Sequence, residues 1–501
     1  MLLNLVIFLP LVGFLLLLFL PKDSHEGIKR AAMVISLAVF AVSLLLIAPV
    51  QQAPAQLSEV TDVPWIDYPA IRYHVGIDGL SLWLVILSTL LTPISILVSW
   101  SYIRKRVKEF FAFLLLLEFG LIGVFVALDF FLFYVFFEVT LVPMYFLIGI
   151  WGHDKRIYAA VKFFLYTLAG SVLMLAAIIY LFNKSGTFDY LVLLDLLRTG
   201  KLALTHLEQT LLFLAFFIAF AIKVPLWPLH TWLPDAHGEA PTAGSVMLAS
   251  VMLKMGTYGL VRFCLPMFPQ AARENAPWIA VLAITGIIYG ALVAMVQPNM
   301  KRLVAYSSVS HLGFVVLGIF SFNQTALDGA VYQMLNHGIS TGALFMLVGY
   351  LYERRHSLEI ADYGGVATPA PKLAAVFAVT MLASVGLPTL NNFIGEYLIL
   401  QGVALVDFKW AVFAAVGVIL SAVYMLWMYQ RTFFGEATEE LKHHMPDMNG
   451  REWAAVAPLL VLMVWMGVYA QSFLPAISAS NARTLDQSKV NVEYQVRLNA
   501  R

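Results

Sequence analysis

The sequence predicts an all-α polytopic membrane protein with about 14 transmembrane helices, and its composition and patterning carry this prediction. Of the 501 residues, 61% are hydrophobic and only 12% are charged, whereas soluble proteins carry about 25% charged residues. Apolar runs of about 20 residues, the length that crosses a bilayer as a helix, recur along the chain. These runs are continuous and do not alternate with polar residues, which excludes a membrane β-barrel.

The same composition excludes several other classes of protein. A soluble enzyme or a disordered chain would carry more charge. A nucleic-acid binder would need a basic excess, and the formal net charge is only +1. The single cysteine, Cys264, excludes a disulfide framework, a cysteine-ligated zinc site and an iron–sulfur cluster within this chain. No phosphate-binding or dinucleotide-binding motif is found in the sequence.

Fourteen apolar runs are long enough to span a membrane, and no stretch between them could form a separate soluble domain. We therefore expect a single membrane domain over residues 1–501. The first run has no basic residue before it, which indicates a membrane helix and not a cleaved signal peptide. The predicted spans lie near 2–20, 31–50, 78–101, 110–128, 129–150, 160–182, 208–227, 242–264, 277–296, 303–321, 328–350, 372–406, 410–430 and 453–472.

The distribution of Lys and Arg predicts the orientation in the membrane. One set of alternate loops carries 18 of these residues and the opposite set carries 7. Because basic loops stay in the cytoplasm, the richer set should be cytoplasmic. With an even number of spans, both termini should then lie outside. The richer set comprises Lys22, Lys29, Arg30, Arg104, Lys105, Arg106, Lys108, Lys155, Arg156, Lys162, Lys301, Arg302, Arg354, Arg355, Lys372, Arg431, Lys442 and Arg451.

Several ionisable residues lie inside the predicted spans. A charge at mid-bilayer costs about 2.5–3.5 kcal/mol on insertion scales, so such a residue faces a bundle interior or water. At 1.5 Å per residue, Lys254 is about 15 Å from either end of its span, too far for its side chain to reach the interface. The candidates are Glu118, Glu138, Lys223, Lys254, His311, His337 and Glu396.

Six of the seven candidates also have a structural interpretation. Lys254 and Glu138 could form interhelical ion pairs, and Lys223 could extend to the interface. Asp129 or a backbone group could satisfy Glu118, and either His311 or His337 could be a hydrogen-bonded core histidine. Packing seldom requires so many costly groups together, whereas proton transfer does. Burial disfavours the charged form of an ionisable group, and histidine titrates near pH 6.5, so a buried series of Glu, Lys and His can relay protons.

Two spans are predicted to break. One carries Pro225 and Pro228, and the other carries Gly386 and Pro388. As a straight helix the span 372–406 would be about 52 Å long, well over the ~30 Å hydrocarbon core. Broken helices in corresponding halves of a transporter mark an ion path, although ordinary proline kinks are the alternative. The breaks, in spans 7 and 12, are about five spans apart. This spacing predicts two inverted five-helix repeats over 110–264 and 277–430.

Four segments resemble a known family. These are EVTLVPMYFLIGIWG (138–152), KVPLWPLHTWLPDAHGEAPTAGSV (223–246), KRLVAYSSVSHLGFV (301–315) and FIGEY (393–397). Together they resemble the antiporter-like membrane subunits of proton-translocating NADH-quinone oxidoreductase, respiratory complex I, over residues 2 to about 470. The acid at Glu396 favours the M type, since L-type and N-type chains usually carry lysine there. Thr389 departs from the family pattern, which usually has glycine at that position.

The resemblance implies a role for most of the buried groups in proton relay, but none for Glu118. It implies that Glu138 pairs with Lys223 and modulates its proton affinity, and that Lys254 is the central lysine of the relay. His311 would lie between Lys254 and the exit, with His337 supporting that step, and Glu396 would be the terminal group toward the outside. His230 and His237 would lie near the cytoplasmic input. On the sequence alone, His230 and His237 could equally be polar residues at loop ends.

The resemblance also implies that redox chemistry takes place elsewhere. Partner subunits would handle NADH, FMN, iron–sulfur clusters and quinone, and this chain would hold no cofactor and no metal. The expected partners are other complex I subunits, including the neighbouring L-type and N-type subunits, together with the lipid bilayer of an energy-converting bacterial inner membrane. Nucleic acid is not expected. The alternatives are a subunit of an Mrp-type cation/proton antiporter or of a membrane-bound hydrogenase, or a membrane scaffold whose charges only hold helices together.

Overall fold

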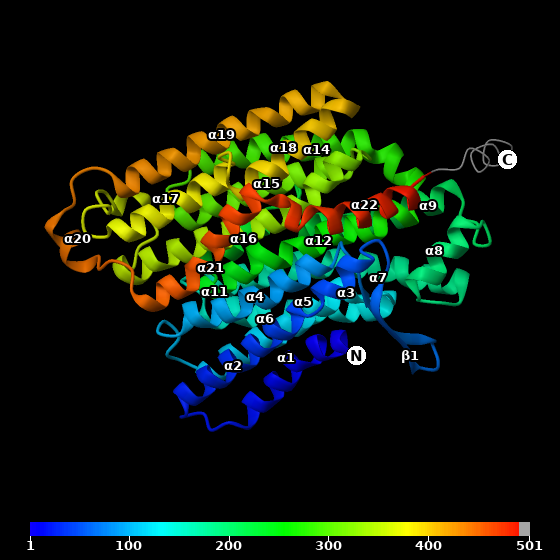
Figure 1. The fold of residues 1–501 in the computed structure, drawn as a ribbon, viewed down its shortest axis with the longest axis horizontal. Helices are drawn as coiled ribbons and strands as arrows, with labels where there is room; N and C mark the ends of the chain where they lie inside the picture. The colour runs from blue at the N-terminus through cyan, green and yellow to red at the C-terminus, as the bar shows by residue number, and fades with distance from the viewer. Residues whose placement is uncertain (490–501) are drawn as a thin grey trace.

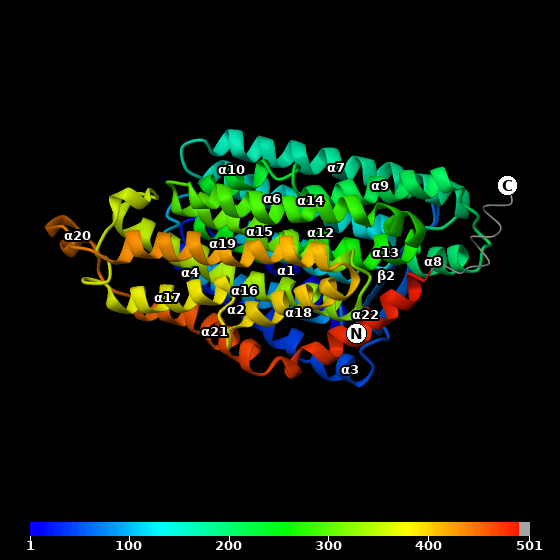
Figure 2. The same ribbon diagram turned by 90° about the horizontal axis from the view of Figure 1, so that it is seen from above.

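The structure is a computed structural model that describes residues 1–489. Its long helices run side by side along one common direction (Figures 1 and 2). Within the described residues, 13 helices are long and apolar enough to cross a membrane. They correspond to 13 of the 14 predicted spans, and the remaining one, 372–406, is a helix broken into two halves. The predicted all-α membrane fold is therefore confirmed.

The N-terminal helices cover one side of the bundle. α1 packs against α2 and α5, and α2 packs against α4. An antiparallel hairpin, β1–β2, follows them and was not predicted from the sequence. Its two strands occupy the loop between the second and third spans. The elements here are α1 (Leu2–Phe19), α2 (His25–Leu44), α3 (Ile47–Gln52), β1 (Ser58–Ile66), β2 (Ile71–Ile77), α4 (Leu82–Ser99) and α5 (Val107–Val126).

The next group of helices contains the first predicted break. α9 ends at Lys223, and the chain resumes as the short helix α10 only at Trp232. The span after it is wound unevenly, because two π-helical turns flank α12. The elements are α6 (Phe130–Trp151), α7 (Arg156–Ser185), α8 (Tyr190–Arg198), α9 (His206–Lys223), α10 (Trp232–Glu239), α11 (Thr242–Met247), η1 (Leu248–Met252), α12 (Leu253–Gly259), η2 (Leu260–Cys264) and α13 (Leu265–Met267).

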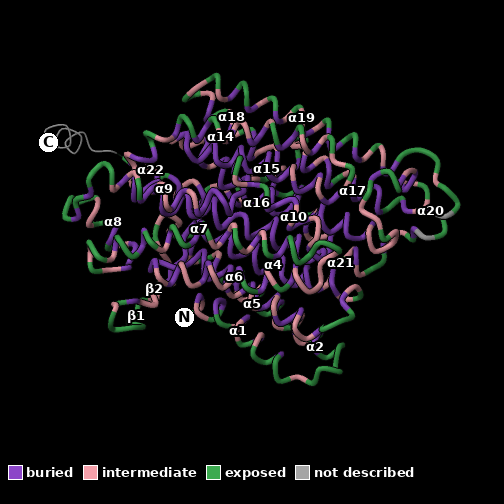
Figure 3. Tube along the Cα trace, turned by 180° about the vertical axis from the view of Figure 1, so that it is seen from behind, coloured by how far each residue is buried: buried purple, intermediate pink, exposed green. Residues whose placement is uncertain are grey.

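The C-terminal half contains the second break and the most enclosed helix. α16 and the α11–α13 span are buried along their whole apolar windows, and the buried backbone lies in the middle of the molecule (Figure 3). The elements are α14 (Pro269–Met295), α15 (Met300–Ile319), α16 (Gln324–Arg355), η3 (Ile360–Asp362), α17 (Pro371–Val385), α18 (Asn391–Val406), α19 (Phe408–Phe433), α20 (Glu439–His444), α21 (Gly450–Val468), η4 (Ala470–Ser472) and α22 (Leu474–Gln487).

The first residue and the last described helix meet the same segment of chain. The amino group of Met1 forms a 2.8 Å ion pair with Glu59 of β1. α22, which lies beyond the last predicted span, donates from Arg483 to the carbonyl of Ala55 at 2.8 Å. Both contacts therefore lie at one end of the bundle, as an even number of spans requires.

Candidate functional site

Lys254 lies at the centre of the bundle and contacts a histidine. Its side chain is fully buried on α12. Its Nζ lies 2.7 Å from Nδ1 of His337 on α16 and donates to the carbonyl of Ala249 at 2.6 Å. Ala249 belongs to the π-helical turn η1, and such turns often occur at functional sites. This burial agrees with the prediction that the side chain of Lys254 does not extend to the membrane interface.

Two further groups continue from His337 toward α18. The rings of His337 and His311 lie edge-on to each other, with centroids 6.0 Å apart. Nδ1 of His311 lies 2.6 Å from Oε1 of Glu396, which also accepts a 3.0 Å hydrogen bond from Gln333. Lys254, His337, His311 and Glu396 therefore form one buried series, which we name the central series. His337, and not His311, is the residue in direct contact with Lys254.

Lys223 is buried and does not extend to an interface. It is 1% exposed, and its Nζ lies 5.1 Å from the ring centroid of Phe137 and 5.4 Å from that of Phe163. Glu138, half-buried on α6, acts on it electrostatically. No direct ion pair between Lys223 and Glu138 occurs in the described part of the chain. The pairing of Glu138 with Lys223 that the resemblance implies is therefore an electrostatic attraction without direct contact in this structure.

His230 and His237 are buried near the break of the seventh span and are not exposed loop ends. The His230 ring centroid lies 5.1 Å from that of Tyr289, and the His237 ring stacks on Phe345 at 4.4 Å. Neither ring nitrogen of either histidine has a hydrogen-bond partner among the described residues. His237 also lies within electrostatic range of Lys301 and of Lys254 in the central series.

Glu118 is fully buried on α5, away from the central series. Asp129 does not satisfy it, because the Asp129 side chain caps α6 and accepts from the backbone N–H of Arg72 at 3.2 Å. Neither oxygen of Glu118 has a hydrogen bond within the usual distance and angle limits among the described residues. Thr92 on α4 is the polar side chain that interacts with the Glu118 carboxyl group. The sequence-based interpretation through Asp129 was therefore wrong.

Arg262 is a buried charge that the sequence analysis missed. Its guanidinium binds both carboxylate oxygens of Asp78, at 2.6 and 2.7 Å. Burial alone would raise the pKa of Asp78, but the charge of Arg262 and the hydrogen bonds from it hold that pKa below its usual value. The signal in the sequence was Asp78 itself, an acid at the very start of an apolar run.

A second missed cluster lies beside the break of the seventh span. Asp235, in the LPDAH segment, accepts from Lys162 at 2.6 Å and from Arg302 at 3.0 Å. Lys301 is 2% exposed and donates to the carbonyl of Ala240. Basic residues that the sequence assigned to loops thus tie α7 and α15 to the α10–α11 segment and hold the broken region in place.

A multi-pass bundle with two broken helices and buried lysine, histidine and glutamate defines an antiporter-like membrane protein. Comparison with known families agrees with this class. The model of the family described as NADH:quinone oxidoreductase/Mrp antiporter, transmembrane, matches residues 127–423.

The full-length comparisons are more specific. Subunit M of NADH-quinone oxidoreductase from Rhodobacter capsulatus is 47% identical over 492 residues, covering 96% of each chain. Its counterpart from Rickettsia typhi is 43% identical, covering 94% of this chain and 96% of the other. The chain belongs to the NADH-quinone oxidoreductase subunit M family.

Solved structures give the same result. A chain of respiratory complex I from Thermus thermophilus superposes with a TM-score of 0.88 at 33% identity, covering 98% of this chain and 100% of that one. A chain of the membrane-bound sulfane sulfur reductase, an archaeal respiratory complex, superposes at 0.84 but is only 22% identical, and so it shares the fold.

Proposed function

We propose that the central series carries protons through this subunit. The chain is a proton-translocating membrane subunit of NADH-quinone oxidoreductase, as its relatives' names indicate. The contact between Lys254 Nζ and His337 Nδ1, 2.7 Å long and fully buried, carries the proposal. A lysine bonded to a neutral ring nitrogen can give up its proton along that bond, whereas a lysine held by a carboxylate is stabilised in its charged form.

The next transfers follow the geometry of the series. After Nδ1 of His337 accepts a proton, Nε2 can release one toward His311, since an imidazole binds protons at either nitrogen. Nε2 of His337 has no protein partner among the described residues. Buried polar atoms usually bond to protein or to ordered water, so a water molecule would join the two rings. His311 then passes a proton to Glu396 through their 2.6 Å contact.

Lys223, Glu138, His230 and His237 would form the input to the central series. In this proposal the charge of Glu138 modulates the proton affinity of Lys223 across the gap between them. His237, buried within electrostatic range of Lys254, would link the two lysines. The unpartnered Nζ of Lys223 and ring nitrogens of both histidines support a hydrated path here.

We further propose how the subunit is placed in its complex. The two five-helix repeats, 110–264 and 277–430, each with one broken helix, would be inverted relative to each other. The termini would lie outside a bacterial inner membrane, and L-type and N-type subunits would be its neighbours. NADH, FMN, iron–sulfur clusters and quinone would bind to partner subunits. The Mrp-type antiporter reading has less support, because the curated relatives compared above are named as subunits of NADH-quinone oxidoreductase.

The proposal is tested by Lys254→Met in the assembled enzyme, with Lys409→Met as control. Methionine keeps the length of the side chain but cannot hold a proton, and Lys409 is an exposed lysine outside the series. We expect Lys254→Met to assemble and to pump fewer protons per NADH oxidised in reconstituted vesicles, while the control pumps normally. Unchanged pumping by assembled Lys254→Met would leave only a scaffold role for the central series.

A further inference from the structure

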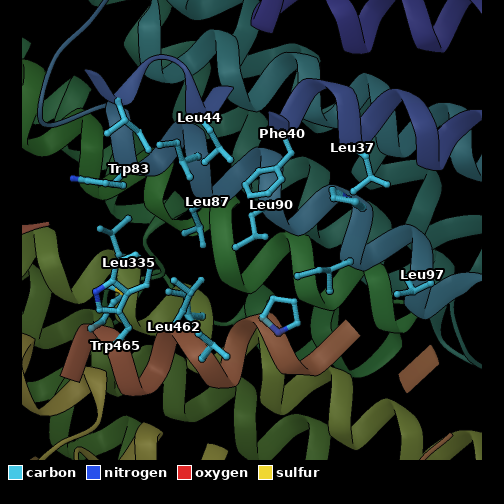
Figure 4. A pocket seen from close by; sticks show the side chains of 18 of the residues that line it. Leu37, Phe40, Leu44, Trp83, Leu87, Leu90, Leu97, Leu335, Leu462 and Trp465 are labelled. Atoms are coloured by element: carbon cyan, nitrogen blue, oxygen red, sulfur yellow. The ribbon is translucent and has the colours of Figure 1, made fainter. Parts of the chain in front are cut away.

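A long apolar groove opens on the side of the bundle away from the central series. Helices α2, α4 and α21 form its walls, and Leu335 and Ile339 of α16 form part of its floor. Its volume is about 1020 Å³. Leucine, tryptophan and phenylalanine side chains from all four helices point into it (Figure 4).

The dimensions of the groove match those of a bilayer. Trp83 and Trp100, near the two ends of α4, both line it. At 1.5 Å per residue they are about 26 Å apart, close to the ~30 Å hydrocarbon thickness. Tryptophan is enriched at the two membrane interfaces, so the groove extends from one interface nearly to the other.

The lining favours lipid chains over a packed protein helix. Helices associate in membranes through small residues that let their backbones approach closely. The groove offers almost none of these, Ala454 and Ser472 being the two exceptions, and its walls are bulky aliphatic and aromatic side chains. Such walls suit flexible acyl chains, which can fill an irregular surface.

The two ends of the groove differ in charge. Arg451 and Trp100 line one end, and the guanidinium of Arg451 donates to Ser101 just beyond α4. Lys29 lies over the Trp100 ring at 5.9 Å, but it is paired with Glu26 at 3.0 Å, so Arg451 is the group that makes this end positive. Gln51 and Ser472, both uncharged, line the other end.

Nearby acids do not neutralise Arg451. Glu452 is bound by Arg354 through two 2.8 Å hydrogen bonds. Glu353 is close enough to interact electrostatically with Arg451, but no ion pair joins them in the residues that the structure describes. The positive charge of Arg451 therefore stays available at the mouth of the groove.

We propose that this groove binds one anionic phospholipid of the leaflet at the Arg451 end. Its phosphate would bind Arg451, because guanidinium forms strong charge-assisted hydrogen bonds with phosphate. Its acyl chains would lie along α4 between α2 and α21. The lipid would join α2, which is largely exposed, to α21, the last of the predicted spans.

The test counts phospholipid bound to the purified complex. Wild-type and variant complexes are stripped with detergent, incubated with phosphatidylcholine vesicles containing phosphatidylglycerol, re-isolated and analysed for bound lipid by mass spectrometry. Arg451→Gln should retain one fewer phosphatidylglycerol per complex than the wild type. Arg431→Gln, the matched control, removes an arginine from the last turn of α19, outside the groove, and should retain the full number.

Two further variants test the same groove if Arg451→Gln fails to assemble. Arg451→Lys keeps the charge and should keep the lipid, whereas Leu37→Trp fills the middle of the groove and should lose it. Retention of the same phosphatidylglycerol by assembled Arg451→Gln or Leu37→Trp would overturn the proposal. Equal retention of phosphatidylcholine at this site, or a crosslink from Leu37→Cys to a neighbouring subunit in place of lipid, would also overturn it.

Discussion

Lys254 and Arg262 are two turns apart on one span, and both are buried, yet their surroundings give them different chemistry. Arg262 is held by a carboxylate through two hydrogen bonds, whereas Lys254 meets a histidine and a carbonyl. Arginine cannot lose its proton in proteins, while a buried lysine can. The same span thus carries one charge suited to fixing helices and one suited to exchanging protons.

Loss of Arg262 should destabilise the subunit. Arg262→Gln would leave the Asp78 carboxylate buried without its counter-charge, which costs about 3–5 kcal/mol. We expect much less assembled complex in membranes, measured by blue-native electrophoresis. The double variant Asp78→Asn/Arg262→Gln should recover part of the loss, because no charge is then stranded. Equal loss in the single and double variants would contradict an ion-pair role.

At the scale of elements, the break between α17 and α18 sets where α18 begins, and Glu396 lies in the second turn of that helix. Gly386 has φ +86° and Thr389 has φ +83°, so both residues adopt left-handed backbone that favours glycine. This backbone agrees with the family resemblance, which implies glycine at the position of Thr389. A Cβ on Gly467 of α21 would lie 2.2 Å from the Thr389 carbonyl oxygen, so α21 packs directly against the break.

Thr389→Gly should stabilise this break. A β-branched residue at positive φ costs about 1–3 kcal/mol, while glycine loses about 0.5–1 kcal/mol of extra entropy on ordering. The net expectation is a gain of about 1 kcal/mol, seen as slower hydrogen exchange over 386–392 in the assembled complex. Thr389→Ala, which keeps a Cβ at the same φ, is the control and should gain less. Faster exchange in Thr389→Gly would show that the threonine is not strained.

A buried side-chain contact outside the membrane spans joins the β1–β2 hairpin to the start of α8. His74 of β2 meets Asp189, at the start of α8, with 2.5 Å between Nδ1 and Oδ2. Burial alone would lower the pKa of His74, but the hydrogen bond and the charge of Asp189 raise it above its usual 6.5. The same contact lowers the pKa of Asp189, although its burial alone would raise it.

Hairpin protection should fall as the pH rises. Because the pKa of His74 is raised on folding, its contribution to stability is complete below about pH 6.5 and is lost as the pH rises through the folded-state pKa. Hydrogen-exchange protection over 58–77, corrected for the intrinsic rate, should therefore decrease at alkaline pH. His74→Asn should flatten this dependence. A wild-type profile that rises with pH would contradict the assignment.

At the scale of the whole molecule, the bundle surrounds one buried column. α16 and the α11–α13 span, which carry His337 and Lys254, are enclosed by the other helices. The hairpin, Met1 and α22 meet at one end of the bundle. The richer set of basic loops lies, by the alternation of the spans, at the opposite end.

This arrangement predicts a labelling pattern. Asp67→Cys, at the exposed turn of the hairpin, should react with a membrane-impermeant maleimide in intact cells. Lys105→Cys, in an exposed basic loop, should react only after the membrane is opened. The native Cys264 is buried and should give little background. The reverse pattern would invert the proposed orientation.

The sequence by itself determined how many times the chain crosses the membrane, where two spans break, and that Lys254 lies too deep in its span for its side chain to reach the interface. These properties depend on local composition. The rise of a helix per residue and the cost of burying a charge in the bilayer do not depend on which other helices surround the span. The depth of Lys254 and the break near Pro388 could therefore be predicted without knowing any neighbour.

Only the tertiary structure decided which buried groups touch. Spans that are apolar on every side carry no periodic signal for the face that meets a neighbour. The rotation of each helix, and so the order Lys254, His337, His311, Glu396, depends on packing between segments far apart in the chain. The π-helical turns, the Asp78–Arg262 pair and the gap between Glu138 and Lys223 have the same origin, since each arises from how helices fit together and not from any one of them.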